Sequence, residues 1–260
     1  MGKFDGYLIC SDLDGTFRAG TDTVEINRNA IKYFTDNGGK FTFTTGRTIS
    51  HLREYNFNDI INAPVGVYNG AVIYDFETEH VLYEKGLTYS VGDFVDAIRS
   101  GLHYRGMLRV HYDCLAERCE IVSFECVDKI LKDIKDIKPL KIVCVFSSEN
   151  EADSFKAFVS DNEFFSDSVI SKAWSEGVEF NSLQATKGAS IEFLKRHLGN
   201  IHTAIGVGDY ENDISLITHA DIGVAVGNAV DKLKCIADMV IRPATEYAIK
   251  DLIEKIENRL

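Results

Sequence analysis

Short apolar runs and amphipathic segments alternate at both ends of this 260-residue chain. Apolar runs occupy residues 7–11, 41–45, 65–68, 204–207 and 222–226, and apolar residues at helical spacing occur at 26–34, 191–198, 214–217 and 249–256. Strands that alternate with helices in this way form a mostly parallel sheet with helices on both faces. We therefore predict an α/β fold with a Rossmann-like, mostly parallel sheet.

The middle of the chain has a different pattern. Alternating stretches at 108–112 and 120–124 come before a predicted helix near 129–136, a predicted strand at 141–146 and a predicted helix at 152–159. Such a pattern is typical of an α+β unit inserted into an α/β fold. We predict a core domain made of residues 1–83 and 181–260, and an inserted α+β domain at 84–180.

The charge balance limits the classes of binding partner. The chain has 28 Lys and Arg residues against 40 Asp and Glu residues, which gives a formal charge of −12. Nucleic acids and anionic membrane surfaces are bound mainly through Lys and Arg, so we expect neither as a partner. The first residues do not resemble a signal peptide and no apolar run reaches the length of a membrane helix, so we expect a cytoplasmic location. Nothing in the sequence specifies an oligomeric state.

The six cysteines form no CxxC pair, and we expect them to be free thiols. A cytosolic chain of this length needs no disulfides. His111, Cys114, Cys119 and Cys126 are close enough in sequence to suggest zinc, which stays open as the alternative, although structural zinc sites usually show tighter paired spacing.

Acidic and polar residues follow several of the predicted core strands. They are Asp12 and Asp14 after the first strand, Thr45, Gly46 and Arg47 after the second, and Asp209, Asn212 and Asp213 after the strand at 204–207. Lys187 begins the helix that precedes this last group. Ligands of open α/β sheets bind outside the carboxyl ends of the strands, so we expect these side chains to surround one point.

The chemistry of this set points to phosphoryl transfer. Oxygen ligands without His or Cys favour a hard cation, with Mg²⁺ as the first candidate. Backbone amides, a hydroxyl and a lysine position a phosphoryl group and neutralise its charge. One carboxylate can attack phosphorus, and a second can protonate the leaving oxygen and later deprotonate a water.

The motifs are those of a known group of enzymes. Asp12-Leu13-Asp14-Gly15-Thr16, Thr45-Gly46-Arg47, Lys187-Gly188 and Gly208-Asp209 with Asn212-Asp213 look like its four motifs in order. On these residues the sequence resembles the haloacid dehalogenase superfamily, and within it the Cof-type phosphatases that carry a large cap between the second and third motifs. Asn69-Gly70-Ala71 and Val226-Gly227-Asn228-Ala229 are similar to that subfamily as well.

The resemblance implies a role for each acidic residue. Asp12 would be the nucleophile and a Mg²⁺ ligand, and Asp14 would be the general acid and base and would lend the metal its backbone carbonyl. Asp209 would be the other carboxylate ligand, with Asp213 in the metal's immediate surroundings or just behind its ligands.

The resemblance also implies which groups hold the phosphate. They are Thr45, Lys187, Asn212 and the backbone amides of Leu13 and Gly46. Arg47 would reach the substrate, reach the cap, or pair with an acid. Tyr210 stands where the subfamily often has a small residue, so its ring would narrow the site or touch the substrate.

We therefore expect a Mg²⁺-dependent phosphatase that acts on small phosphorylated metabolites, sugar phosphates first. A phosphomutase of the same superfamily and a non-catalytic protein that binds a phosphorylated metabolite are the alternatives. Cap residues that could face the substrate are Arg105, Arg109, His111 and Lys172.

Overall fold

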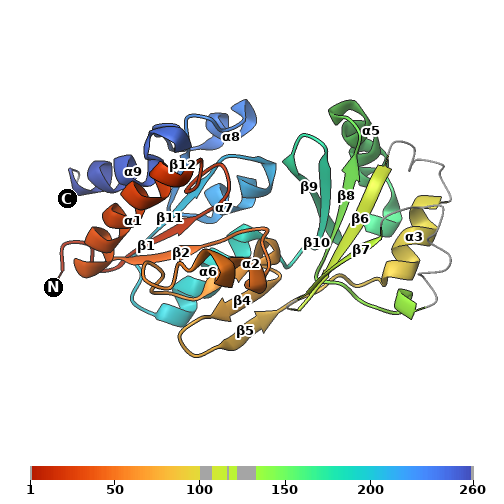
Figure 1. Ribbon diagram of the computed structural model, residues 1–260, viewed down its shortest axis with the longest axis horizontal. Coiled ribbons are helices and arrows are strands. Elements are labelled where there is room, and N and C mark those ends of the chain that lie inside the picture. Colours follow the sequence, from red (N-terminus) through yellow and green to blue (C-terminus); the bar gives the residue numbers. More distant parts are fainter. Residues whose placement is uncertain (1, 100–106, 116, 122–132, 259–260) are drawn as a thin grey trace.

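A five-stranded parallel sheet forms the centre of the core (Figure 1). The computed structural model describes residues 2–99, 107–115, 117–121 and 133–258. The strand order is β13-β12-β11-β1-β2, with β1 at Tyr7–Ser11, β2 at Lys40–Phe43, β11 at Thr203–Gly208, β12 at Ile222–Ala225 and β13 at Met239–Val240. The predicted Rossmann-like sheet is confirmed.

Helices cover both faces of this sheet. They are α1 (Thr21–Asp36), α2 (Ile49–Tyr55), α6 (Lys187–Leu198), α7 (Ile214–His219), α8 (Asp231–Ile236) and α9 (Ala248–Glu257). Successive side chains of a strand point to opposite faces. Accordingly Leu8 and Cys10 of β1 pack with residues of α6 and α7, whereas Ile9 packs with residues of α1 and α9. Each face of the central strand is therefore buried.

The predicted strand at 65–68 belongs to a second, smaller sheet. This antiparallel sheet has the order β3-β4-β5, with β3 at Val65–Val67, β4 at Val72–Asp75 and β5 at His80–Glu84. Its link to the parallel sheet is an isolated bridge between Thr44 and Gly66. The alternation pattern located the strand but not its sheet, because strand pairing depends on the β4 and β5 segments that follow.

The inserted region forms an antiparallel sheet with the order β7-β6-β8-β10-β9. Its strands are β6 (Met107–Cys114), β7 (Glu117–Ile121), β8 (Lys141–Phe146), β9 (Ser168–Trp174) and β10 (Gly177–Ser182), and its helices include α3 (Val91–Arg99) and α5 (Glu149–Ser160). The predicted strand at 141–146 and helix at 152–159 are confirmed. Most of the predicted helix at 129–136, and residues 122–124, lie outside the described residues.

One face of the antiparallel sheet packs against its own helices and the other faces the core. Ile142, Cys144 and Phe146 of β8, with Val178 and Phe180 of β10, join an apolar cluster with residues of α3 and α5. Figure 1 shows these helices on the side of the sheet away from the core, with β9 and β10 nearest to it. The intervening residues of β8 and β10 therefore point toward the parallel sheet.

The part of the chain that the structure describes contains no helix with the length and apolar character needed to span a bilayer.

We expect Phe43→Ala to lower the free energy of unfolding by about 3–5 kcal/mol, because it leaves a cavity in a closely packed aromatic cluster. Phe43 is fully buried, and its ring centroid lies 5.1 Å from those of Phe17 and Phe41 and 5.3 Å from that of Phe57. Urea unfolding followed by circular dichroism measures the loss. Phe164→Ala, at a ring 39% exposed, is the control and should cost much less. Equal losses in the two variants would contradict the prediction.

Candidate active site

The carboxyl ends of β1 and β11 bring three acidic residues together. Residues Ser11 and Val207 lie opposite each other in the parallel pair, and the Asp12 amide continues the ladder by donating to the Val207 carbonyl at 2.8 Å. Asp209 directly follows β11. Carboxylate oxygens of Asp12, Asp209 and Asp213 all lie within 4.8 Å of one another. The sequence-based expectation that these acids converge is thus met by the geometry.

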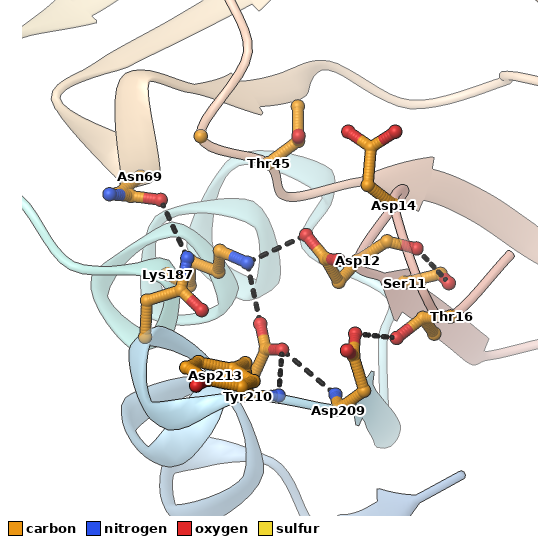
Figure 2. A network of polar contacts seen from close by, with 12 residues as sticks. Ser11, Asp12, Asp14, Thr16, Thr45, Asn69, Lys187, Asp209, Tyr210 and Asp213 are labelled. Atoms are coloured by element: carbon orange, nitrogen blue, oxygen red, sulfur yellow. Dashed lines mark hydrogen bonds and ion pairs between the residues drawn. The ribbon is translucent and has the colours of Figure 1, made fainter. Parts of the chain in front are cut away.

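The turn after β1 wraps around Asp209. Gly15 has φ +83°, and a Cβ atom there would come within 2.5 Å of Asp209 Oδ2, so only glycine fits the position. The Thr16 hydroxyl donates to Asp209 Oδ1 at 2.7 Å (Figure 2). Asn228 supports the turn from behind, since its Nδ2 donates to the Gly15 carbonyl at 2.8 Å. The DxDGT motif therefore fixes the carboxylate of a residue that is distant in sequence.

Lys187 is the cation of the cluster. It is the first residue of α6, whose start is capped by the Thr186 hydroxyl accepting from the Ala189 amide at 3.1 Å. Its Nζ donates to Asp12 Oδ1 at 2.6 Å and to Asp213 Oδ1 at 2.5 Å (Figure 2). Burial alone would lower the pKa of Lys187, but the two carboxylates raise it above its usual value. Lys187 is therefore charged and joins two of the three carboxylates.

The Asp213 side chain accepts hydrogen bonds from the backbone of the loop that follows β11. Its Oδ2 accepts from the backbone amides of Asp209 and Tyr210 at 2.9 and 3.1 Å, while Oδ1 accepts from Lys187. Gly208 gives it room, because a Cβ atom there would lie 2.4 Å from the Asp213 side chain. The Asp213 carboxylate therefore orders the loop that presents Asp209.

The cluster carries more negative charge than one lysine balances. Burial raises the pKa of Asp12 well above its usual value. The positive charge of Lys187 lowers this pKa, whereas repulsion from Asp213 and Asp209 raises it further. Burial together with repulsion from Asp213 raises the pKa of Asp209 to about 7. An excess of buried carboxylate oxygens without His or Cys fits a divalent, oxygen-preferring cation. Asp12, Asp209 and Asp213 are therefore suited to hold such an ion.

A cavity of about 370 Å³ opens in front of the cluster. Its wall includes predicted site residues, namely Asp12, Asp14, Thr45, Gly46, Arg47, Asp209 and Asn212. Tyr210 also lines it, as expected of a ring that narrows the site. Lys187 and Asp213 are not part of this wall, but Lys187 contacts Asp12, which is; the Leu13 side chain is buried in the apolar core. The structure thus gathers most of the predicted residues at one cavity.

Arg47 pairs with an acid, which is one of the three roles expected for it. Its Nε donates to Asp14 Oδ2 at 2.7 Å, and Arg18 Nη1 lies 3.9 Å from Asp14 Oδ1. The Asp14 carboxylate is separate from the cluster of three carboxylates, as Figure 2 shows. Any metal contact of Asp14 through its backbone carbonyl stays a prediction.

Thr45 does not cap the following helix. The cap of α2 is Thr48, whose hydroxyl accepts from the His51 amide at 3.2 Å. The Thr45 hydroxyl instead accepts from the Arg47 amide at 3.2 Å within the turn after β2. Thr45 is nearly fully buried and lines the cavity, which suits the phosphate contact implied by its motif.

Residues of the inserted sheet that the sequence did not reveal complete the cavity wall. They are Lys141, Ala173, Trp174 and Glu179. Of the expected cap candidates, Lys172 does not line this cavity, and its Nζ pairs with Asp153 at 2.6 Å. Arg109 and His111 lie outside the cavity wall, and Arg105 is not among the described residues. The available signal was the strand at 141–146, whose alternation places Lys141 on the face opposite Ile142.

The zinc alternative gains no support within the described ranges. The group of metal-ligating side chains found there contains aspartates alone. Within the described part of the chain Cys10, Cys114 and Cys144 form no disulfide, and the Cys119 side chain and Cys126 lie outside what is described.

Comparisons with known proteins agree with this geometry. The family model of haloacid dehalogenase-like hydrolases matches residues 9–253. A 5-amino-6-(5-phospho-D-ribitylamino)uracil phosphatase of Bacillus subtilis, YcsE, is 26% identical over 254 residues, covering 96% of this chain and 94% of the relative. The structure of the subclass IIB sugar phosphatase BT4131 has a TM-score of 0.74 at 22% identity, covering 96% and 98%. A Cof-like hydrolase from Plasmodium vivax has a TM-score of 0.76 at 20% identity, covering 100% and 97%.

The metal-free protein should lose stability as the pH rises from about 4 to about 7, because a carboxyl with a raised folded-state pKa holds its proton more tightly when folded. The pKa of Asp209 rises from 3.8 to about 7, which sets this window. We expect the Tm in EDTA to be higher near the acid end than near the neutral end, and the difference to shrink in Asp209→Asn. Differential scanning fluorimetry across the pH series measures both. Identical pH profiles for the two proteins would contradict the prediction.

Proposed function

From the premise that this chain belongs to the haloacid dehalogenase-like hydrolases, we propose that it is a Mg²⁺-dependent phosphatase of small phosphorylated metabolites, with sugar phosphates as the first candidates. The observation that carries the proposal is the contact of Lys187 with Asp12 and Asp213 beside Asp209, at the wall of an open cavity. This arrangement holds a carboxylate in one orientation and keeps it facing the space where a substrate would enter. A binding protein would have no use for a nucleophile held in this way.

In the first step an Asp12 carboxylate oxygen attacks the phosphorus of a phosphate monoester. The bond between phosphorus and the leaving oxygen breaks, and Asp14 gives that oxygen a proton. The products are an aspartyl phosphate on Asp12 and a free alcohol. Lys187 keeps Asp12 oriented for attack and offsets charge that develops on the phosphoryl oxygens.

In the second step a water attacks the phosphorus of the aspartyl phosphate. Asp14, which lost its proton in the first step, accepts one from this water. The bond between phosphorus and the Asp12 oxygen breaks, inorganic phosphate leaves, and both carboxyl groups return to their starting states. Thr45, Asn212 and the amides of Leu13 and Gly46 would hold the phosphoryl group throughout.

The carboxylates of Asp12 and Asp209 would hold the cation, with the Asp14 carbonyl as a further ligand and Asp213 bracing the loop. Bound Mg²⁺ supplies positive charge that neutralises the phosphoryl group. The excess negative charge of the buried cluster supports this assignment, because a dication would offset the repulsion that raises the carboxyl pKa values.

The pairing of cations around the cavity favours a hydrolase over a phosphomutase. A mutase has to hold a bisphosphate, which needs positive charge for a second phosphate. Among the described residues of the cavity wall, Arg47 is paired with Asp14, and Lys141 is paired with Glu179 at 2.8 Å. Because both of these cations are already paired with carboxylates, neither Arg47 nor Lys141 supplies positive charge for a second phosphate.

The names of the relatives support a polyhydroxylated leaving group. YcsE is named for a phosphorylated ribityl compound and BT4131 for sugar phosphates. The cavity of this chain is lined by the aromatic rings of Tyr210 and Trp174 and by the polar Lys141–Glu179 pair. This lining suits a leaving group that has both apolar carbon surfaces and hydroxyl groups. We further propose that residues 84–180 act as a cap over this site, and that the protein is cytoplasmic.

We expect the purified protein to release inorganic phosphate from sugar monophosphates in the presence of Mg²⁺, and to stop when EDTA is added. Asp12→Asn should reduce turnover by at least about 1,000-fold, since it keeps the shape of the side chain and removes the nucleophile. A phosphate-release assay across a panel of metabolites measures this. Asp221→Asn, at an exposed acid that pairs with Lys195 of α6 and does not line the cavity, is the matched control and should stay active. Turnover by Asp12→Asn near that of the wild type would overturn the covalent mechanism.

Supplied with a hexose 1-phosphate and a trace of the matching bisphosphate, the protein should release free phosphate as the main product. Both candidate reactions begin with the aspartyl phosphate, but a hydrolase admits water in the second step whereas a mutase excludes it. Phosphate release and formation of the 6-phosphate are followed in the same reaction. Faster accumulation of the 6-phosphate would replace the hydrolase with the mutase.

A further inference from the structure

Lys141 and Glu179 form a buried ion pair between the inserted sheet and the core. Lys141 begins β8 and Glu179 lies in β10, on the sheet face that looks toward the core. Lys141 Nζ donates to Glu179 Oε1 at 2.8 Å, and it lies 3.7 Å from Asp113 Oδ2 on β6. The Lys141 side chain is 1% exposed and Glu179 is equally enclosed. The pair also lines the catalytic cavity.

The first link from this pair to the core runs through Gly46. Lys141 Nζ donates to the Gly46 carbonyl at 2.8 Å. The amide of the same peptide group, that of Arg47, donates to the Thr45 hydroxyl oxygen. The accepted bond fixes the position of the Thr45 hydroxyl oxygen, and the hydroxyl hydrogen can donate to a phosphate. Glycine restrains its backbone least of all residues, so the lysine supplies a restraint that the turn lacks.

The second link runs through Asn69. Its Nδ2 donates to Glu179 Oε2 at 2.8 Å and to Asn181 Oδ1 at 3.0 Å, and its Oδ1 accepts from Asn212 Nδ2 at 3.4 Å. Asn69 has φ +60°, a left-handed conformation that asparagine tolerates better than most residues. Glu179 therefore holds the side chain that in turn orients Asn212.

The energetics argue for a role in positioning. A buried ion pair contributes little net stability compared with apolar residues of the same volume, because both charges lose their hydration. Burial alone would raise the pKa of Glu179, but the charge of Lys141 and its hydrogen bonds from Lys141 and Asn69 lower that pKa below its usual value, so Glu179 is ionised. The ion pair thus places charged groups in contact with the second-motif turn (residues 45–47) and with Asn69, which apolar residues of the same volume would not do.

We propose that Lys141 and Glu179 are positioning residues that set Thr45 and Asn212 for phosphate binding, so that the phosphate site is complete only while the inserted domain is seated on the core. This inference rests on the proposed phosphatase function. It makes the ion pair a part of the active site that the four sequence motifs do not contain.

Phosphate binding by Lys141→Met tests the first link. Removing a charged donor to the Gly46 carbonyl should weaken the affinity for inorganic phosphate, measured with Mg²⁺ by isothermal titration calorimetry, roughly 10- to 100-fold. The kcat for p-nitrophenyl phosphate should fall as well. Lys172→Met is the matched control, because it also removes a buried lysine of the same sheet, whose Nζ pairs with Glu149 and Asp153 of α5 within the inserted region. Equal phosphate affinity of the two variants would overturn the inference.

The double variant Lys141→Met/Glu179→Gln separates positioning from stability. It removes both charges of the Lys141–Glu179 pair, and only Asp113 still loses its contact with Lys141, so its Tm should recover part of the loss seen in Lys141→Met. The Gly46 carbonyl still lacks its donor, so phosphate affinity should stay reduced. Recovery of both Tm and phosphate affinity would overturn the positioning role, since the loss would then be one of stability. If Lys141→Met does not fold, the double variant alone decides.

Wild-type measurements distinguish a failure of this inference from a failure of the proposed function. A wild type that binds phosphate but hydrolyses no monoester overturns the phosphatase assignment, and the variants then judge the positioning role by phosphate affinity alone. A wild type that neither binds phosphate nor releases it overturns both.

Discussion

Repulsion among three carboxylates, two of them buried and one partly buried, is the constraint on which the rest of this structure depends. Asp12, Asp209 and Asp213 come together because two neighbouring parallel strands end at the same edge of the sheet. Buried negative charges are costly unless a cation or hydrogen-bond donors compensate them. Lys187, the Thr16 hydroxyl and the amides of the loop after β11 provide part of that compensation. The remainder is the driving force for binding a divalent cation.

The backbone around this cluster is shaped to leave room for it. Gly15 and Gly208 lie where a Cβ atom would strike the carboxylate of Asp209 or the side chain of Asp213. The final loop contains a left-handed residue that is not glycine, since Tyr247 has φ +63°. The adjoining Ala244 amide still donates to Asn228, so the loop keeps its contact with the turn after β1.

The inserted sheet contributes more than a cover. Alternation along β8 and β10 gives it an apolar face that packs on its own helices and a polar face directed at the core. Lys141, Glu179 and Asn181 on that polar face bond to the second-motif turn, to Asn69 and to the Tyr68 carbonyl. The polar face of the inserted sheet and the turn after β2 are therefore joined by direct hydrogen bonds at the cavity wall.

Local patterns in the sequence determined much of the core. The strands predicted at 7–11, 41–45 and 204–207 could be found because apolar residues recur at a fixed spacing along a strand or helix. The acidic motifs that follow them could be recognised because each motif is contiguous in the sequence. The contacts of Lys141 with Gly46 and of Glu179 with Asn69 join residues 95 and 110 positions apart. Contacts between residues so far apart in sequence depend on how one sheet packs against another. The local spacing of apolar and polar residues contains no information about that packing. The tertiary structure alone therefore decided that a lysine and a glutamate of the inserted region belong to the cavity, and that Arg47 pairs with Asp14.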